Sequence, residues 1–308
     1  MIRRALLAGS QNQWLAQRAP KYGFVRKAVQ RFMPGEDASQ ALEAARALQD
    51  NRIATILTQL GENVKDAGEA EAVTRHYLQV LDRVKEQKLD AVISVKLTQL
   101  GLDLNADSCF TNVRRLVERA NELGNFVWID MEGSAYTDAT LQLYRRVRAQ
   151  HANVGVCLQS YLYRTEKDLA DLLPIAPVIR LVKGAYREPP ALAYPRKKDV
   201  DANYFRLGQR FLDPEVRKAG TRVGFATHDL RLIQKIEELA QQLRIPKESV
   251  EFQLLYGIQR PEQLRLAQSG YRVRVLISYG PQWFPWYMRR LAERPANLTF
   301  LMRNPFSG

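Results

Sequence analysis

The chain has 308 residues, of which 46% are hydrophobic, and its formal net charge is +13. No apolar run approaches the roughly 18 residues of a membrane-spanning helix, which argues against an integral membrane protein. The two cysteines form no Cys-x-x-Cys pair, so the sequence predicts neither a disulfide framework nor a thiolate zinc site and suits a reduced cytoplasmic compartment.

Eight short apolar runs alternate with amphipathic, helix-like stretches along the chain. In order, they are IATILTQL (53–60), AVISVKLT (91–98), NFVWIDME (125–132), NVGVCLQS (153–160), PVIRLVKG (177–184), RVGFATHD (222–229), VEFQLLYG (250–257) and YRVRVLISYG (271–280). Strands that alternate with helices are typical of parallel βαβ units, and eight such units predict a closed α/β barrel of the (βα)8 or TIM type. An open doubly wound sheet is the alternative, but no Gly-x-Gly-x-x-Gly turn follows the first run.

The chain is longer than the roughly 250 residues of a typical barrel. We therefore expect a single catalytic domain over 1–308, in which 1–50 form an amino-terminal helical extension and 51–308 form the barrel. A final helix is expected to lie over the barrel mouth.

The basic charge has three possible interpretations. Lys and Arg are interspersed with acids over most of the chain, which indicates a solvated basic surface and not a nucleic-acid interface. The first 35 residues, however, carry seven Lys or Arg residues and no acid. This segment makes peripheral contact with anionic lipid at the inner membrane a further hypothesis.

Charged residues stand where the second and third runs end. Because side chains alternate along a strand, Ser94, Lys96 and Thr98 share one face, and Asp130 and Glu132 share a face of the next strand. We expect Lys96 and Asp130 to form an ion pair in the barrel mouth. One such pair alone fits a structural role as well as a functional one.

The fifth and sixth runs also end in polar residues. Arg180 and Lys183 have opposite parity unless the strand ends or bulges between them, and Gly184 permits a turn. Together with Thr227 and His228 they could contact a phosphate-bearing cofactor, although an ordinary strand-ending turn and loop fit the same residues.

The sequence lacks the usual motifs of several chemistries. We predict no metal site, because no His-x-x-x-His or His-x-Glu pattern occurs, and no P-loop or Gly-x-Ser-x-Gly elbow is present. The stretch QWFPWYMRRLAERP instead places Arg289 and Arg290 near Glu293. These residues form either surface salt bridges or a paired-guanidinium clamp for a small carboxylate.

The segments RLVKGAYRE, FATHD, EFQLLYGI and WYMRRLAE, in this order, resemble the proline dehydrogenase family. KLTQLGLDL, LQSYLYRTEKDLADLLP and LGENV are also similar to that family. The resemblance, which is greatest to the short monofunctional bacterial enzymes, implies a distorted (βα)8 barrel with noncovalent FAD. It also implies the first step of proline catabolism, in which L-proline becomes 1-pyrroline-5-carboxylate by hydride transfer to the flavin N5 and the electrons pass to membrane quinone.

The resemblance also implies roles for individual residues. Lys96, Arg289 and Arg290 would hold the substrate carboxylate, while Asp130 and Glu293 would orient these cations. The cofactor-contacting positions would be Gln159, Arg180 (near N5), Lys183, Gly184, Ala185, Thr227 and His228. The substrate ring would be walled by Tyr186, Leu255, Leu276 and Trp286. A cation-rich pocket lowers the pKa of the substrate ammonium, so the rate is expected to rise with pH.

Two of these positions depart from the family pattern. Leu276 stands where the family usually has a tyrosine, and Trp286 aligns with a second pocket tyrosine. Hydroxyproline or another cyclic secondary amino acid is therefore an alternative substrate for the same chemistry. An alternative of another class is an inactive barrel that acts as a basic interaction protein. Such a scaffold has no need of the charged residues Lys96, Asp130, Arg289, Arg290 and Glu293.

Overall fold

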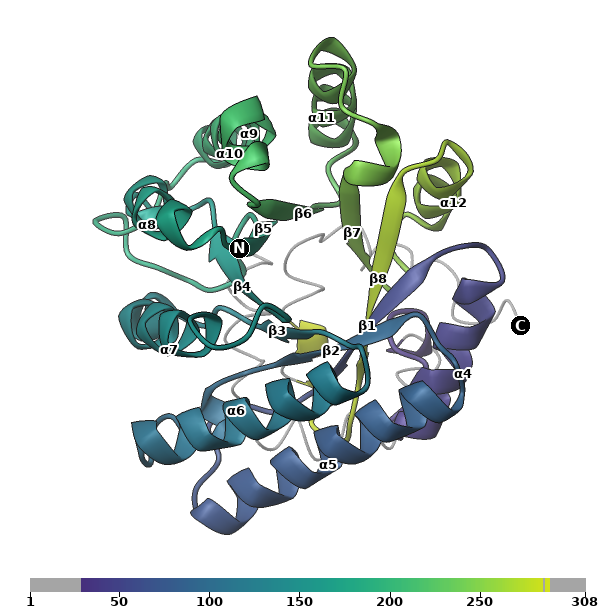
Figure 1. Ribbon diagram of the computed structural model, residues 1–308, viewed down its shortest axis with the longest axis vertical. Coiled ribbons are helices and arrows are strands. Elements are labelled where there is room, and N and C mark those ends of the chain that lie inside the picture. Colours follow the sequence, from purple (N-terminus) through teal and green to yellow (C-terminus); the bar gives the residue numbers. More distant parts are fainter. Residues whose placement is uncertain (1–28, 285, 289–308) are drawn as a thin grey trace.

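The computed structural model describes residues 29–284 and 286–288, and its centre is a closed parallel barrel (Figure 1). All eight apolar runs form strands, which pair in sequence order from β1 to β8 and back to β1. The strands are β1 (Ala54–Gln59), β2 (Ala91–Val95), β3 (Val127–Ile129), β4 (Val154–Gln159), β5 (Val178–Val182), β6 (Arg222–Ala226), β7 (Glu251–Leu255) and β8 (Arg272–Tyr279). The prediction of a (βα)8 barrel is confirmed.

Amphipathic helices surround this barrel and bury their apolar faces against it (Figure 1). They are α5 (Ala67–Glu86), α6 (Ala106–Glu122), α7 (Thr137–Arg148), α8 (Thr165–Leu172), α9 (Lys197–Leu212), α10 (Pro214–Lys218), α11 (Leu230–Gln242) and α12 (Arg260–Gln268), with short 3-10 turns at η2 (Thr98–Leu100), η3 (Ser134–Tyr136), η4 (Leu173–Ile175) and η5 (Lys247–Ser249). In the part of the chain that the structure describes, no helix is long and apolar enough to cross a membrane.

Helix α4 (Ala38–Gln49) completes the ring from the amino-terminal side. It packs against β1 and β8, the position that the helix after the last strand occupies in a regular barrel. Its buried face consists of Ala41, Leu42 and Ala45. A boundary between extension and barrel at residue 50 stays a prediction, and the helices expected within 1–28 lie outside the described residues.

The chain after β8 continues at the carboxyl ends of the strands, because β8 is parallel to its neighbours. Residues 283–284 and 286–288 are helical. Their aromatic side chains pack with Val29, Phe32 and Met33 and with Leu60, which directly follows β1. The described start of the predicted final helix therefore lies beside the barrel mouth, whereas Arg289, Arg290 and Glu293 lie outside the described residues.

The barrel interior has an apolar layer and a polar layer. Ile56, Val92, Trp128 and Val178 are buried together, and Leu276 packs against them. Lys96 and Asp130, which directly follow β2 and β3, and Arg180 of β5 lie nearer the mouth, where parallel barrels place their functional groups.

Candidate active site

The ion pair expected from strand parity is present at the mouth. Lys96 Nζ lies 3.6 Å from Asp130 Oδ2, although β2 ends at Val95 and β3 at Ile129, one residue before each charged side chain. The strand alternation does not extend to Thr98 as predicted, because Thr98 already belongs to η2. Its hydroxyl and its backbone amide both donate to the buried carboxylate of Glu132.

Arg180 is the second cation of Asp130 and is almost fully buried, with 3% exposure. Its Nη1 donates to Asp130 Oδ1 at 2.7 Å and to Ser94 Oγ at 3.2 Å. Its guanidinium carbon lies 4.8 Å from the ring centroid of Trp128, a cation-π distance. Lys96, Asp130 and Arg180 thus form one charged cluster, which is drawn from the ends of β2 and β3 and from β5.

The two cations keep Asp130 ionised. Burial alone would raise the pKa of this carboxyl, but the charges of Arg180 and Lys96 and the hydrogen bond from Ser94 outweigh burial and hold the pKa below its ordinary value. The thiol sulfur of Cys157 lies 3.6 Å from Asp130 Oδ1. Lys96, Asp130 and Arg180 by themselves carry one net positive charge, and the buried carboxyl of Glu132 also interacts electrostatically with Lys96. The cations of this cluster can attract an anionic ligand group.

Several buried polar atoms at the mouth make no hydrogen bond within the described residues. They include Arg180 Nη2, Gln159 Oε1 and Ser160 Oγ, and the residues at or after the ends of β1 and β2 add Thr58 Oγ1, Gln59 Oε1 and Gln99 Oε1. Gln159 ends β4, and its Nε2 donates to the backbone carbonyls of Met131 and Glu132. Buried polar groups of folded proteins are normally satisfied, so unpartnered atoms such as Arg180 Nη2 and Gln159 Oε1 are compatible with a polar ligand at the mouth.

The strand of Arg180 ends at Val182, which resolves the parity conflict. Lys183 leaves the barrel interior and its Nζ pairs with Asp201 of α9 at 2.5 Å and with Asp229 after β6 at 2.8 Å. Lys197 pairs with the same two carboxylates. Burial would raise the pKa of Asp229, but hydrogen bonds from both lysines hold the pKa well below its ordinary value. A role for Lys183 at a cofactor phosphate stays a prediction.

The turn after β5 needs its glycine. Gly184 has a φ of +119°, and a Cβ there would lie 2.2 Å from the ring of Tyr161. Ala185 and Tyr186 follow half-buried, and Tyr186 Oη lies 3.4 Å from Glu62 Oε1, across the mouth on the loop after β1. The loop after β5 therefore reaches across the mouth toward the loop after β1.

The polar residues after β6 turn toward the neighbouring strand. Leu255 N, at the end of β7, donates to His228 Nε2 at 2.9 Å, and Asp229 N donates to Thr227 Oγ1 at 3.2 Å. An accepting Nε2 places the proton of a neutral imidazole on Nδ1. Their contacts with a cofactor stay predictions.

The predicted wall of the substrate pocket comes together in part. Leu255 and Leu276 are register partners on β7 and β8, so they lie side by side at the barrel interior. Trp286 is buried in the aromatic cluster with Phe32 and Trp283. Their contacts with a substrate stay predictions.

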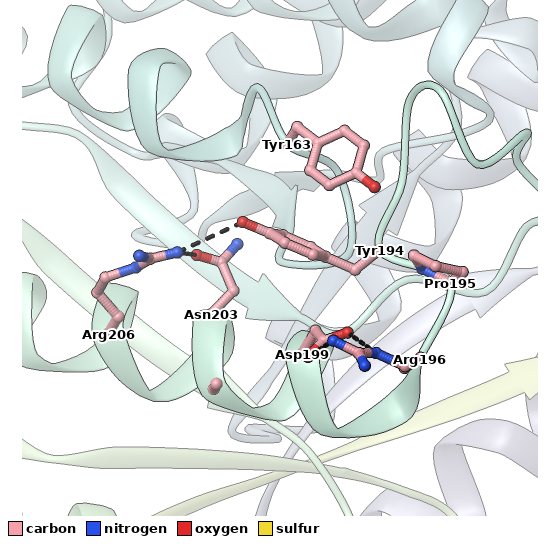
Figure 2. Close-up of a pocket in the computed structure, with 8 residues that line it drawn as sticks. Tyr163, Tyr194, Pro195, Arg196, Asp199, Asn203 and Arg206 are labelled. Carbon is pink, nitrogen blue, oxygen red and sulfur yellow. Dashed lines mark hydrogen bonds and ion pairs between the residues drawn. The ribbon is translucent and has the colours of Figure 1, made fainter.

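A hollow of about 700 Å³ lies elsewhere, between the loops after β4 and β5 and helix α9 (Figure 2). Tyr163 and Tyr194 stand edge to face over it with ring centroids 4.5 Å apart. Arg206 bonds to Asn203 and Tyr194, and Arg196 to Asp199, so its polar side chains satisfy one another. None of the predicted site residues lines this hollow, and we place the active site at the barrel mouth instead.

Two features of the described residues bear on the kind of chemistry. No group of three His, Cys, Asp or Glu residues among them is arranged to hold a metal ion. Both cysteines are free and buried, and burial raises the pKa of each thiol to about 12, which makes them poor nucleophiles.

Fold and site together define a (βα)8-barrel protein whose polar, charged site lies at the carboxyl ends of the strands. A sequence model described as proline dehydrogenase matches residues 41–303. The chain is 35% identical to Proline dehydrogenase 1 of Bacillus subtilis (strain 168) over 303 residues, which cover 98% of each chain. It is 38% identical to Proline dehydrogenase of Deinococcus radiodurans over 285 residues, covering 91% of this chain and 90% of that protein.

A solved structure shows the same fold. The crystal structure of proline utilization A (PutA) from Bdellovibrio bacteriovorus, inactivated by N-propargylglycine, superposes with a TM-score of 0.81 at 25% identity. The match covers 91% of this chain and 34% of that larger protein. The chain belongs to the proline dehydrogenase family.

Proposed function

We propose that this protein oxidises L-proline to 1-pyrroline-5-carboxylate with FAD as its resident cofactor. The observation that carries the proposal is the buried cluster of Lys96, Asp130 and Arg180 at the barrel mouth, in which Arg180 Nη2 has no partner among the described residues. Family membership supports the substrate, because the curated relatives at 35–38% identity are named proline dehydrogenases.

The residues at the mouth fit FAD by their chemistry. Arg180 Nη2 can donate to an acceptor of the isoalloxazine, and Gln159 Oε1 can accept from a ring or hydroxyl donor. Lys183 follows β5, the strand of Arg180, and Thr227 and His228 follow the neighbouring strand β6. These three residues would hold the rest of the cofactor together with the backbone at Gly184 and Ala185. When bound, FAD supplies the two-electron acceptor that no side chain can provide.

The chain's own residues would bind and orient the substrate. Lys96 attracts the carboxylate of proline, and Asp130 holds the Lys96 ammonium toward the mouth. Arg289 and Arg290, predicted to share this task with Glu293 as their partner, would make the anchor bidentate. These contacts bind the carboxylate, away from the bond that breaks, and their binding energy positions the proline ring against the flavin.

The same cations would favour the reactive form of the substrate. A cation-rich site lowers the pKa of the proline ammonium, so more of the bound substrate has the lone pair that imine formation requires. Tyr186, Leu255, Leu276 and Trp286 would exclude water around the ring. Leu276 supports 4-hydroxyproline as a second candidate substrate. A leucine in place of a tyrosine leaves more room in the pocket wall for the 4-hydroxyl group.

The experiment is an anaerobic titration of the FAD-loaded protein, with L-proline and 4-hydroxyproline in parallel. Bleaching of the visible flavin bands by proline, with one pyrroline formed per flavin, supports the proposal. Bleaching by hydroxyproline alone assigns the alternative substrate. A protein that takes up no FAD supports the inactive barrel.

We further propose that membrane quinone accepts the electrons, which rests on the family resemblance and on the basic segment 1–35. That segment lies mostly outside the described residues, and its lysines and arginines would each contribute about 1 kcal/mol near anionic lipid. Vesicles that contain anionic lipid should bind the protein at low salt and release it at high salt. Equal binding to neutral vesicles would exclude this contact.

A further inference from the structure

A line of polar side chains runs through the barrel interior beneath the charged cluster. Arg180 Nε donates to Gln253 Oε1 at 2.8 Å, and Gln253 Nε2 donates to Glu251 Oε1 at 2.6 Å. Glu251 Oε2 in turn lies 3.5 Å from Arg274 Nε. Gln253 and Arg274 are only 3% and 7% exposed, so the amide of Gln253 is held in one orientation by a donor on one side and an acceptor on the other.

Two strand glycines make room for the side chains that hold Arg180. Gly224 of β6 is the register partner of Arg180, and a Cβ there would lie 2.3 Å from Gln253 Nε2. Gly155 of β4 stands on the other side, where a Cβ would lie 2.6 Å from the ring of Trp128. Glycine within a strand often marks such a close approach, and here both strands that flank β5 show it.

These contacts leave Arg180 a single orientation. Gln253 holds its Nε, Asp130 and Ser94 hold Nη1, and Trp128 covers one face of the guanidinium. Nη2 is the nitrogen for which residues 29–284 and 286–288 supply no partner. A planar group fixed at two nitrogens and one face cannot rotate without breaking these contacts, so the direction of Nη2 is set by them.

We infer that Gln253, seated in the space beside Gly224 and oriented by Glu251, is a positioning residue for Arg180. It acts through Arg180 and does not itself touch the substrate. The inference rests on the proposed function for the role of Arg180 at the flavin, and it adds to that function the residue that aims Nη2. Neutrality is part of the role, because a carboxylate at this position would compete with Asp130 for the guanidinium.

The test compares Gln253→Glu and Gln253→Leu with the wild-type FAD-loaded protein. Gln253→Glu should make the flavin midpoint potential more negative, because it adds a negative charge beside Arg180. Both variants should lower kcat about 100-fold, the usual cost of a misplacement near 1 Å, with little change in KM. Gly224→Ala should lower kcat in the same way, since it displaces the amide while every polar group remains.

Thr74→Val is the matched control, because it removes a buried hydrogen bond, from Thr74 Oγ1 to Ala70 O, on α5 outside the barrel interior. It should lower stability and leave kcat and midpoint potential unchanged.

Wild-type kcat and midpoint potential in both Gln253 variants, with reduced stability alone, would overturn the inference. If wild-type flavin is not reduced by proline, the proposed function fails, yet the midpoint potential of Gln253→Leu, which adds no charge and should change only if Arg180 moves, still decides the role of Gln253. If no FAD binds, the orientation of Arg180 in a crystal structure of Gln253→Leu decides it.

Discussion

The charge of Asp130 is the most testable element of the site, and Asp130→Asn removes it without changing the volume of the side chain. The amide oxygen can still accept from Ser94 and from Arg180 Nη1, whose bonds both end on Oδ1. What is lost is the one negative charge between Arg180 and Lys96. Removing one partner of a buried ion pair costs about 3–5 kcal/mol, and the surviving hydrogen bonds place this variant near 3 kcal/mol.

The assay is urea unfolding of both proteins at several pH values. The pKa of Asp130 is depressed in the folded state, so its charge contributes stability that is fully present above the unfolded pKa and is lost as pH falls through the folded pKa. The free-energy difference between wild type and Asp130→Asn should therefore be constant from pH 7 down to about pH 4 and shrink only below it.

Asp171→Asn is the matched control, because Asp171 forms an exposed i,i+4 pair with Lys167 on α8. Its effect on stability should be much smaller at every pH. A loss below about 1 kcal/mol for Asp130→Asn at pH 7, the range of exposed pairs, would refute the electrostatic argument. So would a difference that begins to shrink near neutral pH, because Asp130 would then have a raised pKa.

Three further predictions concern the reaction. Arg289→Met should raise KM for proline strongly and leave the flavin content intact, whereas loss of flavin would show that Arg289 does not bind the carboxylate. Leu276→Tyr should shift selectivity from 4-hydroxyproline toward proline by 10- to 200-fold, or about 1–3 kcal/mol, in kcat/KM, and unchanged selectivity would remove Leu276 from the pocket wall. The rate of flavin reduction at subsaturating proline should rise with pH as the substrate ammonium loses its proton, and a flat profile between pH 6 and about 9 would contradict the role of the cations.

The eight strands could be predicted from sequence because each is a short apolar run bounded by polar residues. The ion pair of Lys96 and Asp130 followed from side-chain alternation, although each strand ends one residue earlier than the alternation implies. Neighbouring parallel strands bring such residues together at one end of the barrel, so a local pattern was sufficient.

Other parts of the site depend on contacts that no local pattern specifies. Lys183 is engaged by Asp201, whose position depends on how α9 packs on the barrel. Gln253 was missed because a single glutamine in an apolar strand is compatible with many surroundings. The sequence feature that could have identified Gln253 is an inward polar residue on β7 beside Gly224 on β6. This combination becomes informative only once the strand register is known.

The most direct test of the central claim is a crystal structure of the protein with FAD and a carboxylate analogue of proline that cannot be oxidised. We predict that the carboxylate pairs with Lys96 and with Arg289 and Arg290, and that Arg180 Nη2 donates to the flavin. A carboxylate bound away from these cations, or an isoalloxazine outside the mouth of the barrel, would contradict the account.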